Sequence, residues 1–153
     1  GRIKRREKFA FVYEVLDSDG AVDQLVLPIY GKGLWSTLYG FLALAADGTT
    51  VRGITFYEHG ETAGLGAEVD NPKWKAIWPG KQIFDENGDI RLEVIKGSVS
   101  PTSPNVKFQV DGISGATITS KGVSQLVRYW LGPDGFGPFL KNFHQQQDQQ
   151  TDA

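Results

Sequence analysis

The chain has 153 residues, of which 40% are hydrophobic and 12% aromatic, and this is enough to bury the core of one compact domain. Its formal net charge of −2 gives no support to a nucleic-acid-binding role. Because it contains no cysteine, the chain can form neither disulfides nor thiolate metal sites, and it has no thiol nucleophile. Nineteen glycines and seven prolines indicate many turns, which favours a strand-rich fold over a helical bundle.

Strand patterns dominate the first 60 residues of the chain. Residues 9–16 and 22–29 flank Asp17–Gly20, which is the pattern of a hairpin with a four-residue loop. Residues 38–45 are apolar and aromatic, and residues 50–57 alternate as a strand. Strands joined by such short turns predict a mainly antiparallel sheet.

Further strands and two helices follow in the second half. The dipeptide Asn87-Gly88 predicts a turn between a strand at 82–84 and another at 90–95. Residues 71–78 have the signature of a helix, with Asn as the N-cap and Pro at the first position. Apolar residues at helical spacing predict a second helix over 120–131.

We therefore expect an α+β fold, with a mainly antiparallel sheet and a few helices. A single domain is predicted over residues 1–143, without an internal repeat. Residues 144–153 are polar and rich in Gln, which predicts a disordered tail.

The most informative segment is Asp111-Gly112-Ile113-Ser114-Gly115-Ala116-Thr117, which follows a β-like stretch at 106–110 and precedes the helix. Glycine and small hydroxylated residues at such a junction can leave backbone N–H groups free to hold an oxyanion or a phosphate. The same residues could equally form a plain tight turn, in which Asp111 and Ser114 satisfy backbone donors locally. Thr119 and Ser120 are more typical of capping residues.

Two other segments combine glycine with residues suited to a planar ligand. In Glu61-Thr62-Ala63-Gly64-Leu65-Gly66 the backbone can approach a ring closely, although Gly-x-Gly is also ordinary turn chemistry. In Gly31–Phe41 the large plane of Trp35 could lie against a ring or fill the core. His59, beside the first of these segments, could touch a ligand or be a solvated residue at a strand end. With His144 as the one other histidine, a transition-metal site is not expected.

These three segments resemble known flavoproteins. Asp111–Thr117 matches, position for position, the flavinylation motif of proteins that carry FMN on a threonine: Asp, two variable residues, Ser or Thr, Gly, Ala, then the acceptor Thr or Ser. Glu61–Gly66 is similar to the Glu-Thr-Pro-Gly-Leu-Gly of the FMN-binding family, with Ala63 in place of proline. Gly-Leu-Trp-Ser at 33–36, followed by Tyr-Gly-Phe at 39–41, resembles the C subunits of the sodium-translocating NADH:quinone reductases. The FMN-bearing G subunits of the Rnf-type electron transport complexes are the alternative.

The resemblance implies a covalent cofactor. In the family, a separate flavin transferase moves FMN from FAD onto the acceptor hydroxyl with the help of a divalent metal, which makes Thr117 the expected site of a phosphoester. Because the motif contains no histidine to act as a base, Thr117 is expected to be a modified residue rather than a catalytic nucleophile. The expected motif residues are Asp111, Ser114, Gly115, Ala116 and Thr117, and the expected further flavin contacts are Trp35, Glu61, Thr62, Leu65 and Gly66.

The resemblance also implies a role and a place in the cell. The domain would be an electron carrier without turnover of its own, taking an electron from a partner redox centre and passing it to the flavin of the reductase's B subunit. In the family an N-terminal membrane helix, which is missing from this sequence, holds the domain on the periplasmic side of the bacterial inner membrane. No catalytic residue and no resident metal are expected.

Overall fold

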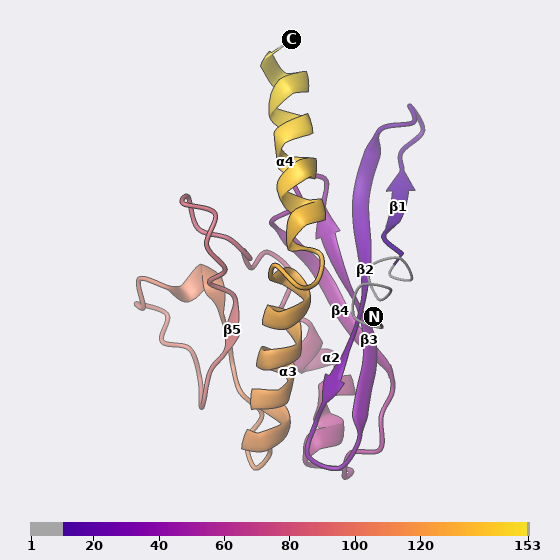
Figure 1. Cartoon of the computed structure of the whole chain (residues 1–153). Coiled ribbons are helices and arrows are strands. Elements are labelled where there is room, and N and C mark those ends of the chain that lie inside the picture. The colour runs from indigo at the N-terminus through magenta and orange to yellow at the C-terminus, as the bar shows by residue number, and fades with distance from the viewer. Residues whose placement is uncertain (1–10, 153) are drawn as a thin grey trace.

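A four-stranded antiparallel sheet forms one layer of the structure, with its strands in the order β1-β2-β3-β4 (Figure 1). The strands are β1 (Tyr13–Leu16), β2 (Val22–Lys32), β3 (Thr37–Ala45) and β4 (Val51–Glu58). The structure is a computed structural model that describes residues 11–152, with side chains as far as residue 147. Together with the helices described below, this sheet confirms the predicted α+β class.

Alternation of side chains gives the sheet one buried face. In β3 the residues Leu38, Gly40, Leu42 and Leu44 are buried, and those between them are partly exposed. Successive side chains of a strand point to opposite faces, so every second residue of β3 enters the core. The predicted strands at 22–29 and 50–57 are confirmed, and β2 continues three residues further, to Lys32.

The long helix α3 (Thr117–Leu131) covers this buried face and packs against β2 (Figure 1). Its buried residues Val123, Leu126, Val127 and Trp130 follow helical spacing, as predicted. The indole N–H of Trp130 donates to the backbone oxygen of a β2 residue, which fixes the helix along the strand. The helix begins at Thr117 rather than at Ser120, so the last residue of the Asp111–Thr117 segment belongs to its first turn.

Two short helical segments follow β4: η1 (Gly66–Asp70) and α2 (Pro72–Lys75). The side-chain oxygen of Asn71 accepts a hydrogen bond from the amide of Lys73 at 2.8 Å, and Pro72 occupies the first helical position. The predicted helix start is therefore confirmed, whereas the helix is shorter than the expected 71–78.

The predicted hairpin around Asn87-Gly88 is largely wrong. Residues 84 and 90 form an isolated bridge, and β5 (Glu93–Val94) pairs in parallel with β6 (Gln109–Val110). Asp85 accepts hydrogen bonds from the amides of residues 87 and 89, so its side chain closes the turn locally and competes with strand pairing. The β-like residues before β6 form the short helix η2 (Val106–Phe108).

The predicted disordered tail is also wrong, because α4 (Gly137–Asp152) continues through most of it. Leu140 and Phe143 are buried on the core side of this helix, and the imidazole of His144 donates to the backbone oxygen of Gly48 at 3.1 Å. Tertiary contacts of this kind stabilise a helix whose composition alone indicates disorder. Within residues 11–152, none of the helices is both long enough and apolar enough to span a membrane.

Replacing Phe143 by Ala tests the anchoring of α4. The change removes a buried ring from the core, so we expect the free energy of unfolding to fall by about 3 kcal/mol in urea titrations. The exposed Gln145→Ala, two residues further on the same helix, should change it by less than about 0.5 kcal/mol. Equal unfolding free energies for the two variants would contradict the docking of α4.

Candidate functional site

The three segments singled out by the sequence lie together at one end of the domain. The β2–β3 turn, the segment that follows β4 and the start of α3 gather there, opposite the C-terminal end of α4 (Figure 1). Between them is a small hollow of about 30 Å³. It is lined by Leu34, Trp35, Glu61, Thr62, Leu65, Gly66, Gly115, Ala116 and Thr119.

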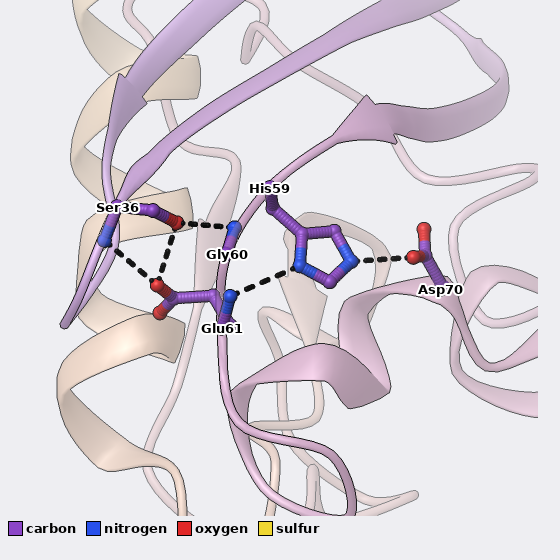
Figure 2. A network of polar contacts seen from close by, with 5 residues as sticks. All are labelled: Ser36, His59, Gly60, Glu61 and Asp70. Atoms are coloured by element: carbon purple, nitrogen blue, oxygen red, sulfur yellow. Dashed lines mark hydrogen bonds and ion pairs between the residues drawn. The ribbon is translucent and has the colours of Figure 1, made fainter.

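The carboxylate of Glu61 connects the turn to the helix. Its Oε1 accepts hydrogen bonds from the Leu34 amide and the Thr119 hydroxyl, both at 2.8 Å. Its Oε2 accepts from the Trp35 amide at 3.0 Å. The same oxygen accepts from the Ser36 amide at 3.0 Å and from the Ser36 hydroxyl at 2.9 Å (Figure 2). The sequence predicts that Glu61 contacts a cofactor, whereas in the structure its carboxylate positions the turn and the helix. Its partners lie 25 to 58 residues away in the sequence, so the motif alone does not reveal this role.

This environment lowers the pKa of Glu61. Burial by itself would raise the pKa, because it disfavours the charged form. The hydrogen bonds from the Leu34 amide, the Thr119 hydroxyl and the turn stabilise the carboxylate and outweigh that effect, so the pKa lies below its ordinary value of 4.5. Glu61 is therefore ionised at neutral pH.

The turn held by Glu61 displays apolar side chains to solvent. Trp35 is 71% exposed, which excludes its alternative role as core filler, and Leu34 is also exposed. Leu65 and Ile118 add further exposed apolar surface from the neighbouring loop and helix. Large apolar side chains gathered on the surface typically mark a binding site.

A local network shapes the turn before α3. The Ser120 hydroxyl donates to the oxygen of Ala116 and accepts from the amide of Ile113, both at 2.9 Å, and the Ala116 amide donates to Ile113. Gly115 has a φ of +76°, a conformation that residues with a Cβ rarely adopt. Neither Ser120 nor Thr119 caps the helix as predicted, because the N-cap is Ala116 and has no side-chain hydrogen bond.

Asp111 fixes the other end of this segment. Its Oδ1 accepts from the Val99 amide at 2.7 Å, and its backbone oxygen accepts from the indole N–H of Trp74 at 2.8 Å. The carboxylate is thus hydrogen-bonded to the loop preceding η2 rather than to Thr117. Through its side chain and its backbone oxygen, Asp111 fixes the start of the Asp111–Thr117 segment.

Thr117 is exposed at the first position of α3. Its hydroxyl makes no hydrogen bond to the part of the chain described, and the amides of Thr117, Ile118 and Thr119 find no acceptor there either. Unpaired amides at a helix start attract anions. Thr117 also borders a groove of about 410 Å³, which is lined by two cationic residues, Lys96 and Lys121, and one acidic residue, Glu93.

The structure gives His59 a place that the sequence did not reveal. Its side chain is only 12% exposed, and both ring nitrogens have partners: Asp70 at Nε2 and the Glu61 amide at Nδ1 (Figure 2). It is neither a solvated strand-end residue nor a lining residue of the small hollow. His144 lies elsewhere, at the β3–β4 turn.

Glu61→Gln tests the connection between turn and helix. The amide group presents N–H donors to groups that themselves donate, so we expect a loss of about 2–3 kcal/mol in unfolding free energy at neutral pH. The exposed Glu58→Gln, with the same charge change, is the control. Because the folded pKa of Glu61 is lowered, its stabilisation is present above pH 4.5 and is lost as the pH falls through the folded value. The difference in stability between wild type and variant should therefore shrink on acidification, and a constant difference would contradict this account.

Gly66→Ala tests the close approach of the loop to α3. A Cβ there would lie 2.7 Å from Oγ1 of Thr119 and 2.9 Å from Cβ of Glu61. We expect the variant to lose about 1–3 kcal/mol and to weaken the Glu61–Thr119 hydrogen bond, measured by urea unfolding and by amide exchange of the β2–β3 turn. A Cβ at Gly53 of β4 meets nothing within 4 Å, so Gly53→Ala is the matched control. Unfolding free energies that agree between the two variants would refute the packing described here.

Several proteins of known sequence are similar to this chain. The C subunit of the Na⁺-translocating NADH-quinone reductase of Pseudomonas aeruginosa is 59% identical over 92% of this chain. The same subunit of Yersinia pestis is 49% identical over 91% of the chain. The chain spans about half the length of these relatives, 53% and 51% respectively.

Solved structures agree with these relatives. The crystal structure of Shewanella oneidensis NqrC matches with a TM-score of 0.80 and 41% identity, over 88% of this chain and 60% of that one. The C subunit of the Na⁺-translocating NADH-quinone reductase of Parabacteroides distasonis matches with a TM-score of 0.69 and 38% identity, over 86% of this chain and 61% of its own. The sequence profile of the FMN-binding domain matches residues 33–132, a range that contains two of the three segments in full and all but the first two residues of Gly31–Phe41. The chain therefore belongs to the FMN-binding domain family.

Proposed function

We propose that this chain carries FMN attached by a phosphoester to the hydroxyl of Thr117. The observation that carries the proposal is the state of that residue: an exposed hydroxyl without a partner in the described part of the chain, beside three unpaired amides at the start of a 15-residue helix. Attachment would replace the bond between FMN phosphate and AMP in FAD by a bond to Oγ1 of Thr117, with AMP leaving. A separate flavin transferase would perform this step.

The surroundings of Thr117 fit a tethered phosphate. The remaining negative charge of the diester would lie near the free amides and the positive end of the helix dipole. Lys96 and Lys121 in the adjoining groove would add favourable charge, which Glu93 in the same groove offsets in part. Ser114 and Gly115 are small and exposed, so the acceptor could enter the cleft of a transferase.

The apolar surface beside the helix start fits the flavin ring. Trp35 and Leu65 are exposed on the turn and the loop, and a Cβ on Gly115 would lie 3.2 Å from Cδ2 of Leu65, so this surface adjoins the flavinylation segment. The small hollow cannot enclose an isoalloxazine ring, so the ring would lie across Trp35 and Leu65 with part of it open to solvent. Thr62, also exposed, would offer a hydroxyl to the polar edge of the ring.

The cofactor would make the domain an electron carrier. Bound FMN supplies the reversible uptake and release of electrons, and the chain contributes attachment, orientation and exclusion of water from one ring face. An open ring edge would let electrons pass to another protein. The phosphoester leaves the ring system itself unmodified and prevents loss of the cofactor.

We further propose that the carrier works as the C subunit of a sodium-translocating NADH:quinone reductase and passes electrons to the flavin of the B subunit. The names of the relatives support this complex over an Rnf-type complex. In this assignment the domain lies on the periplasmic side of the inner membrane.

Co-expression with the flavin transferase tests the attachment. We expect the intact mass of the wild-type chain to rise by one FMN less one water, with a fluorescent band on a denaturing gel. Thr117→Ala should show no gain, because no acceptor oxygen remains, whereas Thr117→Ser should be labelled again. If the wild type gains no mass while the transferase labels a control substrate, or if Thr117→Ala is still labelled, the proposal is wrong.

A further inference from the structure

His59 links the two ends of the loop that carries Thr62 and Leu65. It follows directly after β4, and Asp70 is the last residue of η1, so the contact between them closes a loop over 11 residues of sequence. The loop's exposed residues lie between these two points. Closing a loop at its base restricts the positions that its middle can adopt.

The hydrogen bonds of His59 define its tautomer. The Glu61 amide can only donate, so Nδ1, at 3.2 Å, must accept and carries no proton. The Asp70 carboxylate can only accept, so Nε2 carries the proton and donates it. The neutral Nε2–H imidazole therefore satisfies both partners at once.

The same short stretch is held from a second side. The Gly60 amide donates to the Ser36 hydroxyl at 2.7 Å, and that hydroxyl donates to the Glu61 carboxylate (Figure 2). His59 thus fixes the backbone of Glu61, while the β2–β3 turn and Thr119 fix its side chain. A shift of the Glu61 backbone would be transmitted to the turn that carries Trp35.

We propose that His59 is a positioning residue for the flavin site: its Nδ1 holds the Glu61 amide, and Asp70 holds the imidazole in the tautomer that allows this. This inference rests on the proposed function, because the loop that carries Leu65 and the turn that carries Trp35 are the segments expected to contact the flavin ring. His59 itself need not touch the flavin. Its effect reaches the ring through Glu61, Leu65 and Trp35.

Two amide substitutions separate the hydrogen bonds of the imidazole. The Asn side chain places an acceptor close to the position of Nδ1 and cannot reach Asp70, whereas the longer Gln side chain places a donor close to Nε2 and leaves the Glu61 amide without an acceptor. We expect amide exchange of Glu61 to become roughly tenfold faster in His59→Gln and to stay near wild type in His59→Asn. In the flavinylated proteins, His59→Gln should shift the flavin absorbance bands and midpoint potential, and His59→Asn should largely restore them.

Several outcomes would overturn the inference. If ¹⁵N spectra of the imidazole in the flavin-free chain show a protonated Nδ1, then Nδ1 does not accept the hydrogen bond from the Glu61 amide on which the inference depends. Equal shifts of the flavin bands in both variants, or no shift in His59→Gln, would likewise reject it. Failure of the wild type to take up FMN would contradict the proposed function alone, because the exchange and ¹⁵N measurements need no flavin. Asp70→Asn retains the imidazole and changes only its partner at Nε2. We expect the amide exchange rate of Glu61 in this variant to lie between the rates of wild type and His59→Gln.

Discussion

The arrangement of the site depends on the buried carboxylate of Glu61. It accepts hydrogen bonds from three successive backbone amides of the β2–β3 turn and from the hydroxyls of Ser36 and Thr119. A buried charge is unstable without such partners, and inward-pointing amides of a tight turn need an acceptor. One residue meets both needs, and in doing so it joins an element from the start of the chain to a helix near its end.

This interaction also explains why apolar side chains lie on the surface here. With the amides of the turn directed at Glu61, the side chains of Leu34 and Trp35 are left facing solvent. At the start of α3 the Ser120 hydroxyl closes the preceding turn, so Thr117 and the first free amides are likewise presented outward. Polar interactions inside the protein thus create an apolar surface next to a helix start with unpaired amides, which is the combination that the proposed attachment of FMN needs.

The sequence predicts the sheet and α3 well, because long strands and helices have periods of 2 and 3.6 residues that a linear pattern records. The three segments that it singles out through short motifs lie together in the structure, and their binding of a flavin stays a prediction. The sequence does not predict the parallel pairing of β5 with β6, because two-residue strands have no period. Nor does it predict α4 or the roles of Glu61 and His59, which depend on partners brought close only by folding.

The most direct test of the account is to locate the flavin ring relative to Thr117. Thr117 borders the groove that Lys96 and Lys121 line, and its neighbour Ala116 lines the hollow beside Trp35 and Leu65. Nuclear Overhauser effects from the flavin ring protons can be measured in the flavinylated chain, with assigned side-chain protons. We predict contacts with the indole of Trp35 and the methyl groups of Leu65, on the surface that Glu61 holds in place. Contacts confined to the groove beside Lys96 and Lys121, or none with the protein, would contradict the central claim.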